Sequence, residues 1–278
     1  MEIRRTIPEW ITRLELSPGE KFIFVEGPED QRIMIALGTG STEVRTVMDV
    51  HVDIGEDASP YLAGNRARLV KFAGELALAG ALNAKILIDD DMGPFDPSPL
   101  APANCTRTDF ACLSGGFIRK AELELALLKA LGAEISNDEW RILTAALGSL
   151  FAIRKFRYDN YPHATSPRAA EIIRCVQQIA VLDLKGYLRR LKAGGLQETE
   201  DELATLVIAI KNELKASDYR VYCYSRDFAE ILYKILRCGR KIGSAFRVEH
   251  LWTIVLGSLT LSLDDLPRLK HLLEWAQA

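Results

Sequence analysis

Three acidic residues follow short apolar runs, at the positions where buried strands would end. Glu26 comes directly after Lys21–Val25 (KFIFV), and Asp89 and Asp91 come after Lys85–Ile88 (KILI). In a parallel sheet the carboxyl ends of the strands share one edge, and that edge is where open α/β sheets bind ligands. We therefore expect Glu26, Asp89 and Asp91 to converge at one site.

Carboxylates that share a site repel one another, so they need protons or a cation to remain together. Mg²⁺, or Mn²⁺ with similar oxygen ligands, is the natural partner of such a group. Alternate residues of an extended segment face the same side, so Asp89 and Asp91 would face the metal and Asp90 would point away. The alternative is a solvated DDD turn and a helix-capping Glu26. The position of both motifs after apolar runs favours the metal site.

The surrounding sequence alternates between strand and helix patterns. Pro28-Glu29-Asp30 is typical of a helix start, with proline and acids in the first turn. The segment Glu43–Asp53 favours one or two strands, and Asn65–Leu82 carries a helical stripe. This order predicts right-handed crossovers and a mainly parallel sheet, followed by an extended proline-rich loop over Gly93–Pro102.

The rest of the chain carries mainly helical spacing. The helical segments are expected near residues 117–131, 137–155, 167–192, 198–216, 226–238 and 246–261. Arg220–Tyr224 (RVYCY) is expected to be a late strand. The sequence therefore predicts an α/β fold with a core over residues 1–135 and a mainly helical region over 136–278, whose strand at 220–224 could return to the core sheet.

The charge of the chain is unevenly distributed. The 278 residues sum to −3, but residues 1–150 hold 15 basic and 23 acidic side chains, and residues 151–278 hold 20 and 15. In the basic part, Arg154, Lys155 and Arg157 alternate with aromatic residues, a mixture suited to phosphate contact and base stacking. Arg66, Lys71 and Arg107 are further candidates for nucleic-acid contact. Solvated charges near helix ends are the alternative for all six.

Several classes of protein are excluded or disfavoured. No apolar run approaches the ~18 residues of a membrane span, and the first residues lack the apolar region of a signal peptide. The five cysteines are odd in number and irregularly spaced, so we expect reduced thiols and a cytoplasmic protein. There is no HExxH or C-x-x-C pattern, which disfavours structural zinc and zincin chemistry.

The two acidic motifs resemble those of a known family. Phe24–Asp30 (FVEGPED) resembles the VEG-x-x-D opening of Toprim domains, and Ile88–Asp91 (IDDD) resembles their D-x-D strand end. The resemblance covers roughly residues 20–115. It implies the Toprim fold, a compact Rossmann-like sheet shared by topoisomerases, primases and overcoming-lysogenization-defect (OLD) nucleases.

The remainder of the chain is similar to the helical region of Toprim-like proteins in bacterial antiphage systems. Val221–Asp227 resembles their late strand and "GHD" element, with Ser-Arg in place of Gly-His. The narrowest resemblance is to the effector nuclease of PARIS-type defence, which works with an ABC-type ATPase. It implies a toxic effector that is held inactive by this partner and is a homodimer when active.

The resemblance also implies roles for individual residues. Glu26 matches the Toprim glutamate, a metal ligand or general acid/base, and Asp89 and Asp91 match the metal-binding aspartates. Asp30 matches the last position of the first motif, which supports the metal site, and Asp109 is the candidate for a further acidic ligand. The implied activity is Mg²⁺- or Mn²⁺-dependent hydrolysis of phosphodiesters in RNA, including tRNA, or in DNA.

Two other functions stay open at the level of the sequence. One is a non-catalytic Toprim-like binding module that docks on a partner ATPase. The other is a phosphatase or phosphotransferase on a Rossmann-like sheet. Such enzymes usually place a nucleophilic aspartate after the first strand, where this chain has Glu26.

Overall fold

The computed structural model describes residues 4–53, 64–91, 102–161, 167–192, 196, 198–214, 218–257 and 259–278. The chain divides into two compact units, which are Met1–Ser114 together with Leu261–Ala278, and Gly115–Thr260. This division differs from the expected boundary after residue 135. The second unit begins earlier, and the end of the chain returns to the first unit. Apart from Pro102, the expected proline-rich loop lies outside the described residues.

The first unit is built on a four-stranded sheet in the order β3-β2-β5-β6. Its strands are β2 (Phe22–Val25), β3 (Glu43–Thr46), β5 (Ala84–Ile88) and β6 (Cys105–Arg107). Every neighbouring pair is parallel, as expected from the alternation of strands and helices. A separate parallel pair joins β1 (Arg5–Thr6) to β4 (Val50–His51), and Val47–Asp49 forms the 3₁₀ helix η1.

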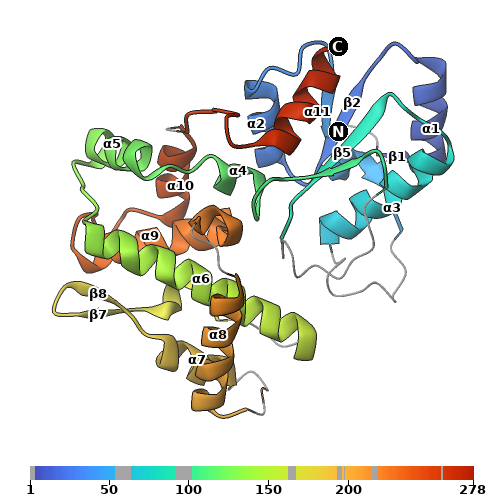
Figure 1. The fold of residues 1–278 in the computed structure, drawn as a ribbon. Helices are drawn as coiled ribbons and strands as arrows, with labels where there is room; N and C mark the ends of the chain where they lie inside the picture. Colours follow the sequence, from blue (N-terminus) through green and yellow to red (C-terminus); the bar gives the residue numbers. More distant parts are fainter. Residues whose placement is uncertain are drawn as a thin grey trace. The chain divides into compact units, whose positions relative to one another are not determined.

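Helices cover both faces of this sheet (Figure 1). The helices α1 (Ile7–Leu16) and α3 (Gly64–Leu78) lie on one face, and α2 (Pro28–Ala36) and α11 (Pro267–Gln277) lie on the other. On the first face the rings of Trp10 and Phe72 meet Phe24 edge-on, at centroid distances of 5.0 and 4.9 Å. Such pairs add about 0.5–1.5 kcal/mol each to the free energy of burial. The strand β2 is therefore held firmly at the centre of the sheet.

The C-terminal helix α11 is bonded to the first unit at both of its ends. At its C-terminal end, Thr42 Oγ1 donates to Ala276 O at 2.8 Å and Lys21 Nζ donates to Trp275 O at 2.8 Å. At its N-terminal end, Asp109 accepts from the backbone N–H groups of Arg268 and Leu269. These contacts span most of the length of the chain, and local sequence patterns do not encode them.

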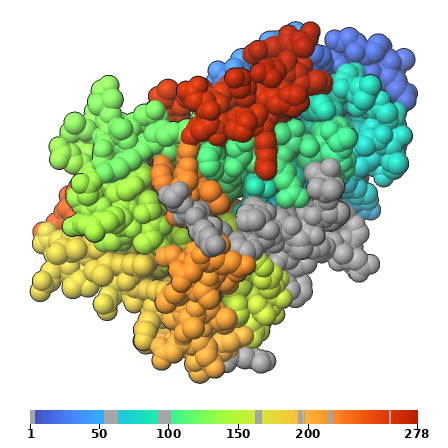
Figure 2. Space-filling model, in the orientation of Figure 1, coloured from blue at the N-terminus to red at the C-terminus, as the bar shows by residue number. Residues whose placement is uncertain are grey.

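The second unit is mainly helical, which agrees with the expectation for the later part of the chain. Its helices are α5 (Lys120–Leu131), α6 (Asn137–Asn160), α7 (Leu184–Lys192), α8 (Glu200–Leu214), α9 (Ser225–Cys238) and α10 (Val248–Gly257), and the short α4 (Leu113–Gly116) spans the boundary between the units. Ser136 and Glu139 form a capping box that starts α6. Leu147 of α6 and Phe228 and Leu232 of α9 are buried in the same core. Figure 2 shows α8 (orange) at the surface of this unit.

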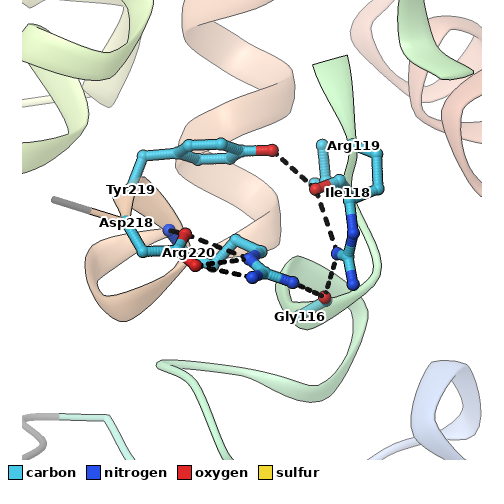
Figure 3. A network of polar contacts seen from close by, with 6 residues as sticks. All are labelled: Gly116, Ile118, Arg119, Asp218, Tyr219 and Arg220. Carbon is cyan, nitrogen blue, oxygen red and sulfur yellow. Dashed lines mark hydrogen bonds and ion pairs between the residues drawn. The ribbon is translucent and has the colours of Figure 1, made fainter. Parts of the chain in front are cut away.

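The expected strand over Arg220–Tyr224 is wrong. Tyr219–Tyr222 forms the 3₁₀ helix η5, whose start is capped by the side chain of Asp218. Figure 3 shows the network that fixes this turn. The buried guanidinium of Arg220 pairs with Asp218 and donates to Gly116 O at 3.2 Å, and Tyr219 Oη donates to Ile118 O. The side-chain bonds hold the segment in a turn, so this segment does not add a strand to the sheet.

The expected helix over residues 167–192 is correct only in its last part, which is α7. Ala169–Ile172 is the 3₁₀ helix η4, and the antiparallel strands β7 (Ile173–Val176) and β8 (Ile179–Leu182) form a hairpin. Gln177 and Gln178 have φ of 48° and 68°. Positive φ at both central residues defines the type I′ turn that suits a two-residue hairpin, and it is usually signalled by Asn-Gly or Asp-Gly. The Gln-Gln pair gave no such signal.

The expectation that all thiols are reduced is also wrong. A disulfide joins Cys175 of β7 to Cys238 at the end of α9, with the two Cα atoms 5.5 Å apart. That separation lies within the range that a disulfide spans. Irregular spacing did not reveal this pair because the two cysteines are 63 residues apart in the chain. Among the described helices, none is long and apolar enough to cross a membrane.

Candidate functional site

The first unit brings two of the three strand-end acids into contact. Glu26 follows β2 and Asp89 follows β5, and these strands are neighbours in the sheet. Glu26 Oε1 accepts a hydrogen bond from the backbone N–H of Asp89 at 3.0 Å. The backbone carbonyl of Glu26 accepts from Asn65 Nδ2 of α3, also at 3.0 Å. The parallel sheet therefore places the two acids side by side at its carboxyl edge.

Asp89 is further fixed by the start of a helix. Asp89 Oδ1 accepts from the backbone N–H of Leu113, the first residue of α4, at 3.0 Å. Burial raises the pKa of Asp89 well above its usual value, and the nearby charges of Glu26 and Asp30 raise it further. Leu113 carries no side-chain signal for this role, and sequence reasoning missed it.

Glu26 and Asp30 also have raised pKa values. Burial, followed by the charge of Asp91, raises the pKa of Glu26 to about 7. Burial, followed by the charge of Glu29, raises the pKa of Asp30 to about 7, while Asp30 Oδ2 accepts from the backbone N–H of Gly27 at 3.1 Å. Buried acids that lie close together repel one another when they are ionised. The site is therefore stabilised either by protonation of these acids or by a bound cation.

Asp91 lies beside a buried arginine. Arg66 Nη1 and Asp91 Oδ2 are 2.8 Å apart, and only 5% of the Arg66 side chain is exposed. Asp91 has a φ of 26°, an uncommon conformation for a residue other than glycine. Arg66, which the sequence indicated as a nucleic-acid contact, is the counter-charge of the acid cluster in this structure.

Asp90 points to a different set of partners, as the D-x-D spacing indicated. Its carboxylate lies 3.5 Å from Arg107 Nη1 and 3.7 Å from Arg268 Nη1, and its backbone N–H donates to Thr108 Oγ1. Arg107 is therefore paired within the unit. Arg268, which comes from the far end of the chain, was not among the residues that the sequence pointed to.

Lys71 and Asp109 have local structural partners. Lys71 Nζ donates to Asp53 O at 2.6 Å at the surface. The two carboxylate oxygens of Asp109 accept from the N–H groups of Arg268 and Leu269 at 3.0 and 3.1 Å. Asp109 therefore caps the N-terminus of α11, because its oxygens accept hydrogen bonds from the first N–H groups of the helix.

The residue types of the site fit a hard divalent cation. Four acids, three of them with raised pKa values, form the oxygen-rich donor set that Mg²⁺ uses. Within the described part of the chain, no group of three or more Asp, Glu, His or Cys side chains is oriented so that it could hold a metal ion. The hydrogen bonds explain this, because Asp89 turns one oxygen to Leu113 and Asp91 turns to Arg66.

Two of the three basic candidates of the second unit pair with acidic side chains of the same unit. Arg154 Nη2 lies 2.5 Å from Asp227 Oδ2, and its guanidinium carbon lies 4.0 Å from the centre of the Tyr224 ring. Lys155 pairs with Asp159 one turn along α6. Arg157 lines a small hollow together with Arg154. The Asp227 that follows the Ser-Arg pair is thus a buried partner of Arg154.

Comparison of the chain with protein-family models and with curated protein sequences finds no match.

Proposed function

We propose that this protein is a metal-dependent nuclease of the Toprim type, with Glu26, Asp89 and Asp91 as its catalytic acids. The observation that carries the proposal is the contact between Glu26 and the Asp89 backbone at the carboxyl ends of adjacent parallel strands. Two further buried or half-buried acids, Asp30 and Asp91, act electrostatically on this pair. A cluster of this kind has a use for a divalent cation and no evident use in stability, since buried acids destabilise a fold.

Each residue has a distinct task in the proposed reaction. Asp89, Asp91 and Glu26 would hold Mg²⁺ or Mn²⁺, and the metal would supply Lewis-acid stabilisation of charge on the phosphodiester. In the metal-free protein burial raises the pKa of Glu26 to about 7, so the alternative role of Glu26 is that of a general acid/base near neutral pH. Arg66, which pairs with Asp91 at 2.8 Å, would help to balance the negative charge of the acid cluster. Asp30 holds the tight turn after β2 through Gly27.

The finer parts of the proposal rest on the resemblance of the motifs. They are the Rossmann-like Toprim identity of the sheet, the role as a toxic antiphage effector in the cytoplasm, control by an ABC-type ATPase, and a homodimeric active form. RNA, with tRNA as one class, and DNA are the proposed substrates. In the first unit the parallel sheet and the strand-end acids support this assignment.

The direct test is cleavage by purified protein. We expect RNA or DNA to be cut with Mg²⁺ or Mn²⁺ and not with EDTA. Glu26→Gln should slow cleavage by about 10²–10⁴-fold, because the variant keeps the hydrogen-bond acceptor and loses the proton-transfer group. Glu15→Gln on the exposed side of α1 makes the same chemical change away from the site and should retain activity. Equal cleavage by wild type and Glu26→Gln would contradict the assignment.

The binding-module alternative has one observation in its favour. In the described residues the acids are paired with Arg66 and with backbone N–H groups instead of facing one common point. A module that only docks on an ATPase would need no metal. Calorimetric titration with Mg²⁺ and Mn²⁺ separates the two functions. Heat that is lost in Asp89→Asn supports the nuclease, and an absence of binding to wild type supports the module.

A further inference from the structure

The second unit contains a small hollow that the proposed nuclease chemistry does not use. It has a volume of about 110 Å³ and is lined from α6, α7 and α9 and from the segment before η4. The lining residues are Leu150, Ile153, Arg154, Arg157, Tyr158, Pro167, Ala169, Tyr187 and Asp227. Pockets for drug-sized molecules measure about 300–1,000 Å³, so this hollow suits a single small group and not a nucleoside.

Arg154 is positioned in the hollow with one donor to spare. Its Nη2 pairs with Asp227, and its guanidinium stacks on the ring of Tyr224. Within the described part of the chain, Nη1 of Arg154 is buried and meets no hydrogen-bond acceptor. A buried donor without an acceptor is costly. A ligand oxygen in the hollow would satisfy it.

The charges of the lining favour an anion. Arg154 and Arg157 are positive and Asp227 is negative, so the lining residues sum to one positive charge. The hydroxyl of Tyr187 donates to Pro167 O at 3.0 Å, and burial, the main cause, raises the pKa of Tyr187 to about 12, which keeps this hydroxyl neutral. Arg154 and Arg157 lie one turn apart on α6, so both guanidinium groups can contact one group in the hollow. Guanidinium groups are the side chains best matched to phosphate oxygens.

We propose that this hollow binds one phosphate group, held by Arg154 Nη1 and the guanidinium of Arg157. Asp227 keeps Arg154 in place as a positioning residue, and the Tyr224 ring covers its other face. The group can be inorganic phosphate or the terminal phosphate of a nucleotide or nucleic acid. The site needs neither the strand-end acids nor a divalent cation, so it does not depend on the proposed nuclease activity.

The test titrates purified full-length protein with inorganic phosphate by calorimetry, in a phosphate-free buffer that contains EDTA. Phosphate should bind to wild type, and Arg157→Gln should weaken binding about tenfold or more, the effect of losing one charge-assisted contact. Arg226→Gln removes an equal charge one residue before Asp227, from a side chain that is 88% exposed, and should bind as wild type. Absent binding, equal binding by Arg157→Gln, or equal binding of acetate would each overturn the proposal.

One further variant tests the role of Arg154. Arg154→Gln alone leaves Asp227 buried without its partner and could unfold the unit, so it is combined with Asp227→Asn, which removes both charges together. This double variant should fold, as judged by circular dichroism, and should lose phosphate binding. A folded double variant that retains wild-type binding would contradict the role of Arg154.

A second arm identifies the source of the phosphate. A 5′-phosphorylated oligonucleotide is compared with its 5′-hydroxyl form in the Glu26→Gln background with EDTA. Tighter binding of the phosphorylated form that depends on Arg157 assigns the site to nucleic-acid ends, and binding of inorganic phosphate alone assigns it to free phosphate. Glu26→Gln itself should bind inorganic phosphate as wild type, so a failure of the nuclease proposal is separate from a failure of this one.

Discussion

At the scale of single residues, the acid cluster has a clear effect on stability. Glu26 is an ordinary acid in the unfolded chain but has a pKa of about 7 in the folded protein, mainly because it is buried. The folded state therefore binds more protons than the unfolded state between about pH 4.5 and 7, and stability falls as the pH rises through this window. A bound divalent cation would offset this loss by balancing the charge.

This gives a prediction for Glu26→Gln in the absence of metal. The variant should be more stable than wild type at pH 8, by on the order of 2–3 kcal/mol, because it removes a buried charge and keeps the acceptor for the Asp89 N–H. Urea unfolding in EDTA between pH 5 and 8 measures the difference, which should shrink toward pH 5. Glu15→Gln provides the control. A Glu26→Gln stability curve parallel to that of wild type would rule out the raised pKa as the cause.

Asp109 is the residue at which capping and metal binding can be separated. Its two oxygens receive the N–H groups at the start of α11, so Asp109→Ala should lower the free energy of unfolding by about 1 kcal/mol, the usual effect of losing a cap. Asp109→Asn keeps one acceptor and should lose less. Calorimetry of Mg²⁺ binding should be unchanged in Asp109→Asn; weaker metal binding in this variant would give Asp109 the ligand role that the resemblance implied.

At the scale of elements, the sequence predicted the strands that are set by local patterns and missed the turn that is set by contacts between distant residues. The runs KFIFV and KILI identified β2 and β5 correctly because fully buried strands of a parallel sheet are continuously apolar. The positions of Glu26 and Asp89 followed from those strands. The turn at η5 was missed because Asp218 and Arg220 act through Gly116, which lies far away in the chain. Nothing in the periodicity of RVYCY reveals that partner.

The disulfide was missed for the same reason, and it makes a prediction for the β7–β8 hairpin. Cys175 links this hairpin to the end of α9 and closes a loop of 63 residues. Reduction should lower the free energy of unfolding by about 2–4 kcal/mol, since the reduced unfolded chain gains conformational freedom. Denaturant unfolding with and without dithiothreitol measures this difference. In Cys175→Ser/Cys238→Ser the free energy of unfolding should not change with the reductant. Unfolding of wild type that is insensitive to dithiothreitol would contradict the link.

At the scale of the whole molecule, each unit gathers charged side chains at one place, which the uneven charge of the sequence did not reveal. In the first unit the acids gather at one sheet edge, and Arg66, Arg107 and Arg268 are used to balance them. In the second unit Arg154 and Arg157 both line one small hollow. The sequence could locate the basic residues, but not the Asp227 that draws Arg154 inward, because that contact joins residues 73 positions apart.

The late position of α11 in the sequence affects how the first unit folds during synthesis. The sheet is synthesised first, and the second unit follows, but one face of the sheet lacks α11 until residues 261–278 leave the ribosome. The hydrogen bonds that Thr42, Lys21 and Asp109 make with α11 can form only after those residues have been synthesised. If the acid edge cuts nucleic acid, its Asp90 would gain its contact with Arg268 only after the second unit has been synthesised.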